Sequence, residues 1–193
     1  MSGSSSPRGG YKLAFIGTHG VGKTTLCYGL ASRLKAKDVV LEVVHEVARR
    51  CPLPLNEQTS LASQSWILHT QLAEEVVASA RYPVVLCDRS ALDNYVYMLI
   101  ASGSQASLET LLAHWMRSYA CLVYVPVLGG PRPDGFRAID PVFQMAVDER
   151  LRKEIDQRHL TTLALDPRRR DHWIEDVEEH VMEALRPAQL PLL

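Results

Sequence analysis

A glycine-rich stretch near the start of the chain, GTHGVGKT at residues 17–24, fits the pattern GxxxxGK[ST] at every defined position. Glycine lets consecutive backbone N–H groups turn toward one point and form a nest for anions. We expect Lys23 to reach the β- and γ-phosphates of a nucleotide, and the Thr24 hydroxyl to bind Mg²⁺. The stretch lies between a predicted strand and a predicted helix, which is the context this motif requires. The nucleotide-binding residues predicted here are Gly17, His19 (a variable position of the motif), Gly20, Val21, Gly22, Lys23, Thr24 and Thr25.

Two acidic residues come directly after predicted strands, where parallel sheets bind their ligands. Asp88 closes the apolar run at 83–88 and takes the position of a Walker-B carboxylate, which holds Mg²⁺, usually through water. Glu46 follows the run at 39–45 and is placed to accept the proton of an attacking hydroxyl. Arg49 would share a helical face with Glu46 and hold the acceptor or its phosphate. The alternatives are a helix cap at Asp88 and a surface ion pair at Glu46.

Three further polar residues lie close to Asp88 in the sequence. Arg89 is placed to neutralise the charge of a phosphoryl group in transfer. Asp93 and Tyr97 fall on the side of the following helix that faces the strand ends, so we expect both to contact the acceptor. The acceptor-binding residues predicted from the sequence are Glu46, Arg49, Asp93 and Tyr97.

The segment LGGPRPDGFRAIDP at 128–141 combines glycine, proline and arginine in a way that suits a hinged loop. We expect a lid, in which Arg132 and Arg137 meet the phosphates only when the loop closes and excludes water. The alternative is that both are ordinary exposed arginines. The residues expected to take part in catalysis are Lys23, Glu46, Asp88, Arg89 and Arg137.

Alternating strands and helices must bring these side chains together. Apolar runs predict strands at 11–17, 39–45, 83–88, 119–127 and 160–166. Helices are expected at 22–37, 46–50, from a cap at 59 or 60 to 81, and at 90–101, 107–117, 142–158 and 169–186. The strands are continuous apolar runs, which is typical of a parallel sheet covered on both faces. We therefore predict an α/β, three-layer P-loop NTPase fold, with a five-stranded parallel sheet, helices on both faces and a kinase-like lid.

One domain is expected at 11–186, with a flexible N-terminal tail at 1–10 and a C-terminal tail at 187–193. For the longest helix we predict an inner stripe made of Trp66, Leu72, Ala73, Val76, Val77 and Ala80.

Composition excludes several classes of protein. The chain has 193 residues, of which 47% are apolar, and this composition excludes fibrous and disordered proteins. Its formal net charge of −1 gives no overall electrostatic attraction to nucleic acid or membranes. It lacks an apolar run of the ~20 residues that span a bilayer. The four cysteines form no CxxC pair and the seven histidines no zinc-binding spacing. We expect a cytoplasmic monomer or homodimer.

Several segments together resemble small P-loop kinases: GTHGVGKTTL, HEVAR, QSWILHTQ, VVLCDRSALDNYVY and PDGFRAID. Over roughly residues 11–185 the chain is similar to nicotinamide riboside kinase-like proteins, many of them labelled AAA-type ATPases, which use an ExxR and a DGxR motif. Its DRS triplet is similar to that of deoxynucleoside and thymidylate kinases. The resemblance implies that Glu46 or Asp88 is the base and that Arg49, Arg89 and Arg137 contact phosphates. This chain has Asp88-Arg89 where the nicotinamide riboside kinases favour Asp-Thr. The departure argues against nicotinamide riboside as the substrate.

The sequence thus predicts an Mg²⁺-dependent kinase that moves the γ-phosphate of ATP to a small nucleoside-like or nucleotide acceptor. The alternatives are an NTP hydrolase, a polynucleotide 5′-kinase whose acceptor is a nucleic-acid end, and a nucleotide-binding switch without significant turnover.

Overall fold

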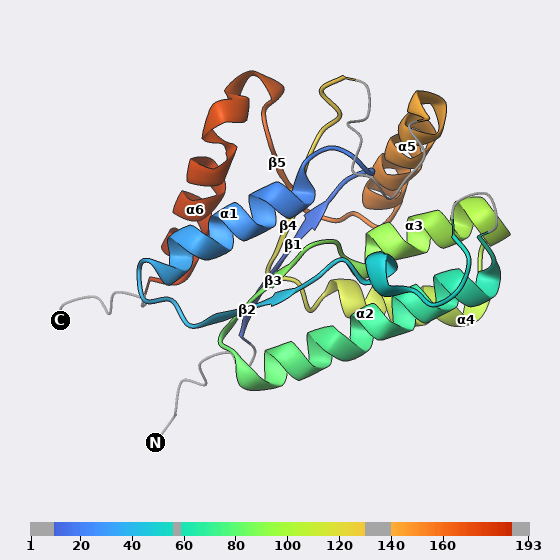
Figure 1. Cartoon of the computed structure of the whole chain (residues 1–193), viewed down its shortest axis with the longest axis horizontal. Coiled ribbons are helices and arrows are strands. Elements are labelled where there is room, and N and C mark those ends of the chain that lie inside the picture. The colour runs from blue at the N-terminus through green and yellow to red at the C-terminus, as the bar shows by residue number, and fades with distance from the viewer. Residues whose placement is uncertain (1–9, 56–58, 130–139, 187–193) are drawn as a thin grey trace.

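The computed structural model describes residues 10–55, 59–129 and 140–186. Five parallel strands form one sheet in the order β2-β3-β1-β4-β5 (Figure 1), which confirms the predicted sheet. The strands are β1 (Tyr11–Ile16), β2 (Leu41–Val44), β3 (Val84–Cys87), β4 (Cys121–Tyr124) and β5 (Leu163–Ala164). Because β1 is central and β3 pairs with it, the loop after β1 and the residue after β3 reach the same edge of the sheet.

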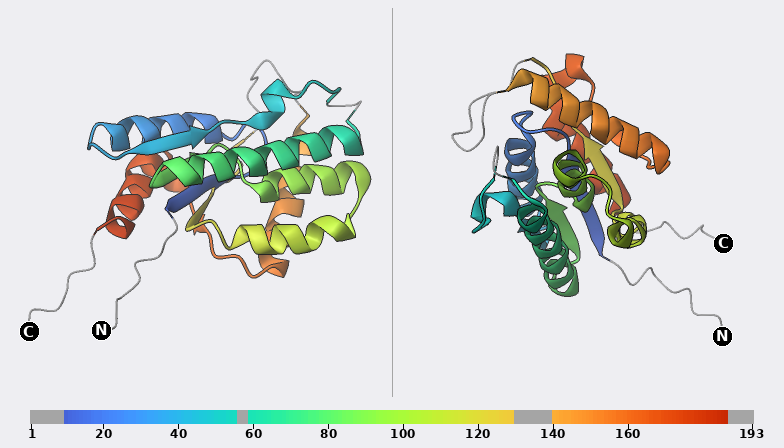
Figure 2. Two further views of the ribbon diagram at one scale, coloured as in Figure 1. Left: turned by 90° about the horizontal axis from the view of Figure 1, so that it is seen from below. Right: turned by 90° about the vertical axis from the view of Figure 1, so that its right-hand side faces the viewer.

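Helices cover both faces of the sheet and complete the predicted three-layer fold (Figures 1 and 2). Helices α1 and α6 pack on one face, and α2, α3, α4 and α5 pack on the other. The helices are α1 (Lys23–Lys35), α2 (Leu61–Arg81), α3 (Ala91–Ser102), α4 (Ala106–Met116), α5 (Pro141–Gln157) and α6 (Trp173–Ala184), with 3₁₀ segments η1 (Val47–Arg50) and η3 (Pro167–His172).

The central strand β1 is buried on both faces, as its apolar run predicts. Leu13 and Phe15 pack with α1 and α6, whereas Ala14 and Ile16 pack with the helices of the opposite face. All four side chains are fully buried. Burying each larger one contributes about 1.5–3 kcal/mol, so the strand that carries the glycine-rich loop is also a rigid base for it.

The prediction for the inner face of α2 is wrong. Of the predicted stripe only Leu72 is buried; Trp66 is half-buried, and Val76 and Val77 are 55% and 49% exposed. The remaining two residues of the stripe, Ala73 and Ala80, are exposed too. The helix instead turns inward a face that includes Gln71 and Glu75, as well as apolar residues. A stripe chosen by apolarity misses this face because its polar side chains are hydrogen-bonded inside the protein.

Some sequence predictions concern residues outside the described ranges. They include the lid arginines Arg132 and Arg137, the tail at 187–193 and all of the N-terminal tail except Gly10. In the part of the chain that is described, helices are too short or too polar to cross a bilayer. The four cysteines all lie in that part and form no disulfide.

Candidate active site

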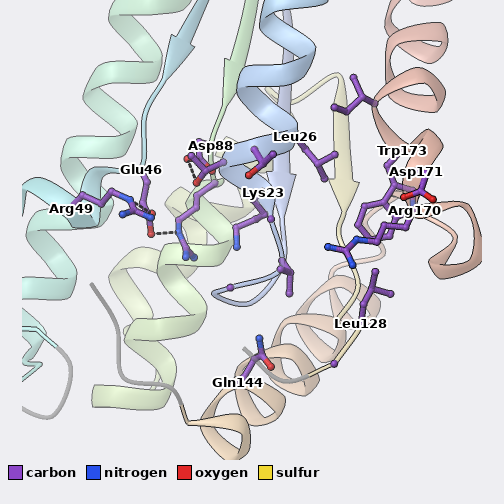
Figure 3. Close-up of a pocket in the computed structure, with 18 residues that line it drawn as sticks. Lys23, Leu26, Glu46, Arg49, Asp88, Leu128, Gln144, Arg170, Asp171 and Trp173 are labelled. Atoms are coloured by element: carbon purple, nitrogen blue, oxygen red, sulfur yellow. Dashed lines mark hydrogen bonds and ion pairs between the residues drawn. The ribbon is translucent and has the colours of Figure 1, made fainter. Parts of the chain in front are cut away.

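A cavity of about 700 Å³ opens at the carboxyl edge of the sheet, around the start of α1 (Figure 3). One end is bordered by η1 and the end of β3, and the other by η3 and the start of α6. Its lining residues are Gly20–Leu26, Glu46, Arg49, Asp88, Arg89, Leu128, Gly129, Gln144, Arg170, Asp171, Trp173 and Ile174. The volume lies in the range of small-molecule sites.

The loop between β1 and α1 has a backbone that needs glycine. Gly17, Gly20 and Gly22 have φ angles of +151°, +72° and +96°, which L-residues rarely adopt. A Cβ atom at Gly17 would also lie 2.7 Å from the carbonyl oxygen of Val125. Helix α1 starts directly after Gly22, which supplies no side-chain cap. Its first N–H groups therefore face the cavity as donors for an anion, in addition to the positive end of the helix dipole.

Lys23 lies inside this loop and is 4% exposed. Its Nζ atom donates to the carbonyl oxygens of Gly17, at 2.8 Å, and Thr18, at 2.5 Å. Burial, followed by the nearby Arg89 guanidinium, lowers the pKa of Lys23 to about 7. A bound phosphate chain would favour the charged amine and raise this pKa again.

Thr24 and Asp88 meet as expected from the neighbouring positions of β1 and β3. The Thr24 hydroxyl donates to Oδ2 of Asp88 over 2.7 Å, and both residues line the cavity. Burial raises the pKa of Asp88, against the lowering effect of the Thr24 hydrogen bond and of Lys23. Mg²⁺ prefers such oxygen donors and needs only one or two carboxylates when phosphates supply the rest. The pair therefore fits Mg²⁺, although the described residues contain no cluster of three acidic, histidine or cysteine ligands.

Glu46 joins two arginines at the η1 end of the cavity. Its Oε1 atom accepts from Nε of Arg89 and its Oε2 atom from Nε of Arg49, both at 2.8 Å. The predicted pair of Glu46 and Arg49 is thus present, but the carboxylate is buried rather than a surface group. Dashed lines in Figure 3 mark interactions of this cluster and of Asp88.

Arg89 is held in an unusual conformation. Its side chain is buried, its backbone φ is +113°, and its guanidinium lies over the Tyr97 ring, 5.3 Å from the centroid. Among the described residues, its buried Nη1 atom finds no hydrogen-bond acceptor. Backbone strain of this kind costs about 1–3 kcal/mol and is found mostly at functional sites. Arg89 thus combines a place in the cavity lining with a buried N–H donor that has no acceptor among the described residues.

Asp93 and Tyr97 do not line the cavity. Asp93 is buried, and its carboxylate accepts from the Gly17 N–H at 2.9 Å and from the backbone and hydroxyl of Ser90. Tyr97 bonds the His19 ring over 3.2 Å. Both residues therefore support the glycine-rich loop and Arg89 from behind, and the structure does not place them where a direct contact with an acceptor was expected.

His19 and Gly17 likewise lie outside the lining of the cavity. The His19 ring stacks on Phe143 with centroids 5.8 Å apart, and its carbonyl oxygen accepts from Nε2 of Gln144 at 2.8 Å. The first residues of α5 thereby fix the loop. Sequence reasoning missed Gln144, because nothing in the pattern of α5 distinguishes it from other polar residues.

The segment after β5 has two interpretations from the sequence, a lining for the base of the nucleotide or a charged turn that caps a helix. Asp166 caps η3 by accepting from the Arg168 N–H at 2.9 Å, as a charged turn would, yet Arg170 and Asp171 from the same segment line the cavity. Trp173, at the start of α6, is buried and also reaches the cavity. Their place in the sequence explains this, because they follow β5 as Leu128 follows β4, and both strands end at the edge of the sheet where the cavity lies.

Comparison with known proteins gives one family and one group of similar folds. A family model described as an AAA domain (AAA_28) matches residues 12–172. No curated protein matches. A structure of deoxyadenosine kinase from M. mycoides, with the products dCMP and a flexible dCDP bound, superimposes with a TM-score of 0.60, 16% identity and coverage of 90% of this chain and 98% of that one. The same enzyme with bound dATP gives a TM-score of 0.55, 15% identity and coverage of 91% and 98%. These matches establish a shared fold.

Proposed function

This chain belongs to the AAA domain family, and from that premise we propose that it is an Mg²⁺-dependent kinase. It transfers the γ-phosphoryl group of ATP to a small nucleoside-like or nucleotide acceptor. One observation carries the proposal: a single cavity extends from the glycine-rich loop to the cluster of Glu46, Arg49 and Arg89. An enzyme that uses only water needs no such cluster beside its phosphate loop. The dCMP, dCDP and dATP bound to the M. mycoides enzyme of similar fold support an acceptor of this class.

The phosphate chain of ATP would bind at the glycine-rich loop. The N–H groups that begin α1 donate to it, and Lys23 exchanges its two carbonyl contacts for phosphate oxygens. Thr24 and Asp88 would hold Mg²⁺, which would neutralise part of the charge of the phosphates. The adenine side of the nucleotide would extend toward Arg170 and Trp173 at the other end of the cavity.

The acceptor would bind at the η1 end. Glu46 lines this end of the cavity and is held there by Arg49 and Arg89, so its carboxylate is placed to accept the hydroxyl proton of an acceptor. Arg89 presents its Nη1 donor to the phosphoryl group in transfer. Arg49, whose side chain is 40% exposed, would contact the outer part of the acceptor. These roles leave Asp88 for the metal and Glu46 for the proton.

The test is a panel of acceptors incubated with ATP and Mg²⁺. Nucleosides, deoxynucleosides, nucleoside monophosphates and 5′-hydroxyl oligonucleotides are each assayed for ADP and, by mass spectrometry, for a product heavier by one phosphoryl group. We expect transfer to at least one small acceptor and none by Lys23→Ala. Transfer only to oligonucleotides would indicate a polynucleotide 5′-kinase. ADP without any phosphorylated product would indicate a hydrolase, and tight ATP binding without ADP a switch.

A further inference from the structure

A fully buried carboxylate lies outside the lining of the cavity. Glu75 of α2 is 0% exposed and accepts four hydrogen bonds. Its Oε2 atom accepts from Lys12 Nζ at 2.7 Å and Trp115 Nε1 at 2.8 Å, and its Oε1 atom from Tyr119 OH at 2.6 Å and Gln71 Nε2 at 2.9 Å. The Lys12 ammonium also lies 4.3 Å from the centroid of the Tyr119 ring. We call these five residues the Glu75 network.

Such a network is not explained by stability alone. A buried ion pair must offset the desolvation of both charges, and apolar residues of similar volume are often as stabilising. Burial, followed by the charge of Glu75, raises the pKa of Tyr119, which keeps its hydroxyl protonated as a donor. A carboxylate that accepts from four fixed donors therefore determines the orientation of each donor.

Two members of the network reach the segment after β3. Gln71 Nε2 donates to the carbonyl oxygen of Arg89 at 3.3 Å, and the Tyr119 hydroxyl accepts from the Ala91 N–H at 3.0 Å. Glu75 sets both contacts. Because a carboxylate only accepts, the NH₂ group of Gln71 must face it, and the second hydrogen of that group is then directed at Arg89. Because the Tyr119 proton goes to Glu75, its oxygen lone pair is left for Ala91.

These two contacts hold the backbone at Arg89 and at Ala91, on either side of Ser90. Arg89 has a strained φ of +113°, and Ser90 begins α3 with a capping box. The same segment is also held by the Asp88 N–H, which donates to the carbonyl oxygen of Val44 at 2.9 Å, and by two side-chain contacts, Asp88 with Thr24 and Arg89 with Glu46. A strained backbone persists only where its surroundings determine it, and the Glu75 network contacts the backbone on both sides of Ser90.

We propose that Gln71 and Tyr119 are positioning residues, oriented by Glu75, that hold the Arg89 backbone so that its guanidinium meets Glu46 and the phosphoryl group. The catalytic part of this inference rests on the proposed kinase function, whereas the effect on the Arg89–Glu46 contact does not. Neither residue lines the cavity, so neither touches a substrate. Their loss would displace Arg89 without removing any group from the site.

The chain offers a matched pair of variants. Tyr119→Phe and Trp115→Phe each remove one hydrogen-bond donor from Glu75, but only Tyr119→Phe also removes the partner of Ala91. Gln71→Met keeps the length of the side chain and removes the donor to Arg89. We measure the nitrogen-15 NMR signal of Arg89 Nε–H, assigned by its loss in Arg89→Lys, together with kcat and KM for the best acceptor and the melting temperature.

We expect Gln71→Met and Tyr119→Phe to shift this signal and to speed its exchange with water, because the ion pair with Glu46 loosens. Their kcat should fall about 10- to 100-fold while KM for ATP changes less than 3-fold, since misplacement by about 1 Å costs up to about 10²-fold. Trp115→Phe should lower the melting temperature similarly but keep the signal and kcat. An unchanged signal in Gln71→Met and Tyr119→Phe, or an equal change in Trp115→Phe, would overturn the proposal.

Two safeguards keep the test decisive. Should Gln71→Met fail to fold, Tyr119→Phe against Trp115→Phe gives the same comparison. Should the wild-type protein phosphorylate no acceptor, the kinase proposal fails, and the Nε–H signal alone still decides whether the network positions Arg89.

Discussion

Replacing Glu46 by glutamine is the perturbation that best separates the acceptor side of the cavity from ATP binding. Each carboxylate oxygen accepts from one arginine, whereas a glutamine side chain has a single acceptor atom. The buried Arg89 cannot reach water, but the half-exposed Arg49 can. We therefore expect the glutamine carbonyl to face Arg89 and Arg49 to turn to solvent.

The size of the effect follows from that geometry. A hydrogen bond to a charged group contributes about 1.5–3 kcal/mol, and the substitution keeps the buried one in weakened form. The free energy of unfolding should fall by about 2 kcal/mol, which lowers Tm by about 4–8 °C. Because the general base is lost, transfer to the acceptor should fall about 10²- to 10⁴-fold. The affinity for ATP should stay within about 3-fold, because the N–H groups and the lysine that would bind phosphate all remain in the Glu46→Gln protein.

Three measurements on one preparation test this expectation: ATP binding by calorimetry, transfer by product mass, and thermal unfolding. Glu74→Gln is the control, because it makes the same substitution in a partly exposed ion pair with Arg50, and neither residue of that pair lines the cavity. Its stability should change by less than about 1 kcal/mol and its transfer rate not at all. Full transfer activity in Glu46→Gln would refute the role of Glu46 as base. A loss of ATP affinity as large as that of transfer would show that Glu46 belongs to the nucleotide side.

Three further predictions concern the glycine-rich loop and its metal pair. In the nucleotide-free protein, Lys23 has a pKa of about 7 when folded and an ordinary one near 10.5 when unfolded, so the unfolded chain binds the extra proton. The free energy of unfolding of the wild-type protein, relative to that of Lys23→Met, should therefore rise from pH 7 to pH 9 by up to about 1.4 kcal/mol per pH unit. The same dependence of this free energy on pH in both proteins, measured by urea unfolding, would contradict a buried lysine with a lowered pKa. Asp88→Asn should remove both transfer and background hydrolysis, with partial recovery at high Mg²⁺, and unchanged hydrolysis would exclude Asp88 as metal ligand. Gly17→Ala should destabilise by about 1–3 kcal/mol and weaken ATP binding, because its Cβ would meet the Val125 carbonyl at 2.7 Å; native stability in chemical denaturation would show that this contact relaxes.

The parts of the fold and site that the sequence predicts correctly are those set by local patterns. Continuous apolar runs indicate parallel strands, and the glycine spacing before Lys23 specifies a loop whose φ angles only glycine adopts readily. The neighbouring positions of Thr24 and Asp88 follow, because β1 and β3 end at one edge. The roles of these residues in binding and catalysis stay predictions.

What the sequence does not predict depends on partners far away in the chain. Glu75 looks like a solvent-facing residue of α2 until Lys12, 63 positions earlier, is seen beside it. Asp93 has the right helical side for an acceptor contact, yet its hydrogen bond to the Gly17 N–H, 76 positions away, turns it to the back of the loop. Helical spacing predicts the side of the helix on which a residue lies, but it does not predict which polar group the side chain will contact there.

The central claim is that the cavity joins ATP to an acceptor other than water, and the fate of the γ-phosphoryl group tests it most directly. ATP labelled only in that group is incubated with the protein, Mg²⁺ and saturating acceptor, and the label is counted in phosphorylated acceptor and in inorganic phosphate. The account predicts that most of the label enters the acceptor in the wild-type protein, and that Glu46→Gln shifts the remaining label toward phosphate. Label found only in inorganic phosphate, at the same rate with and without every acceptor tested, would contradict it.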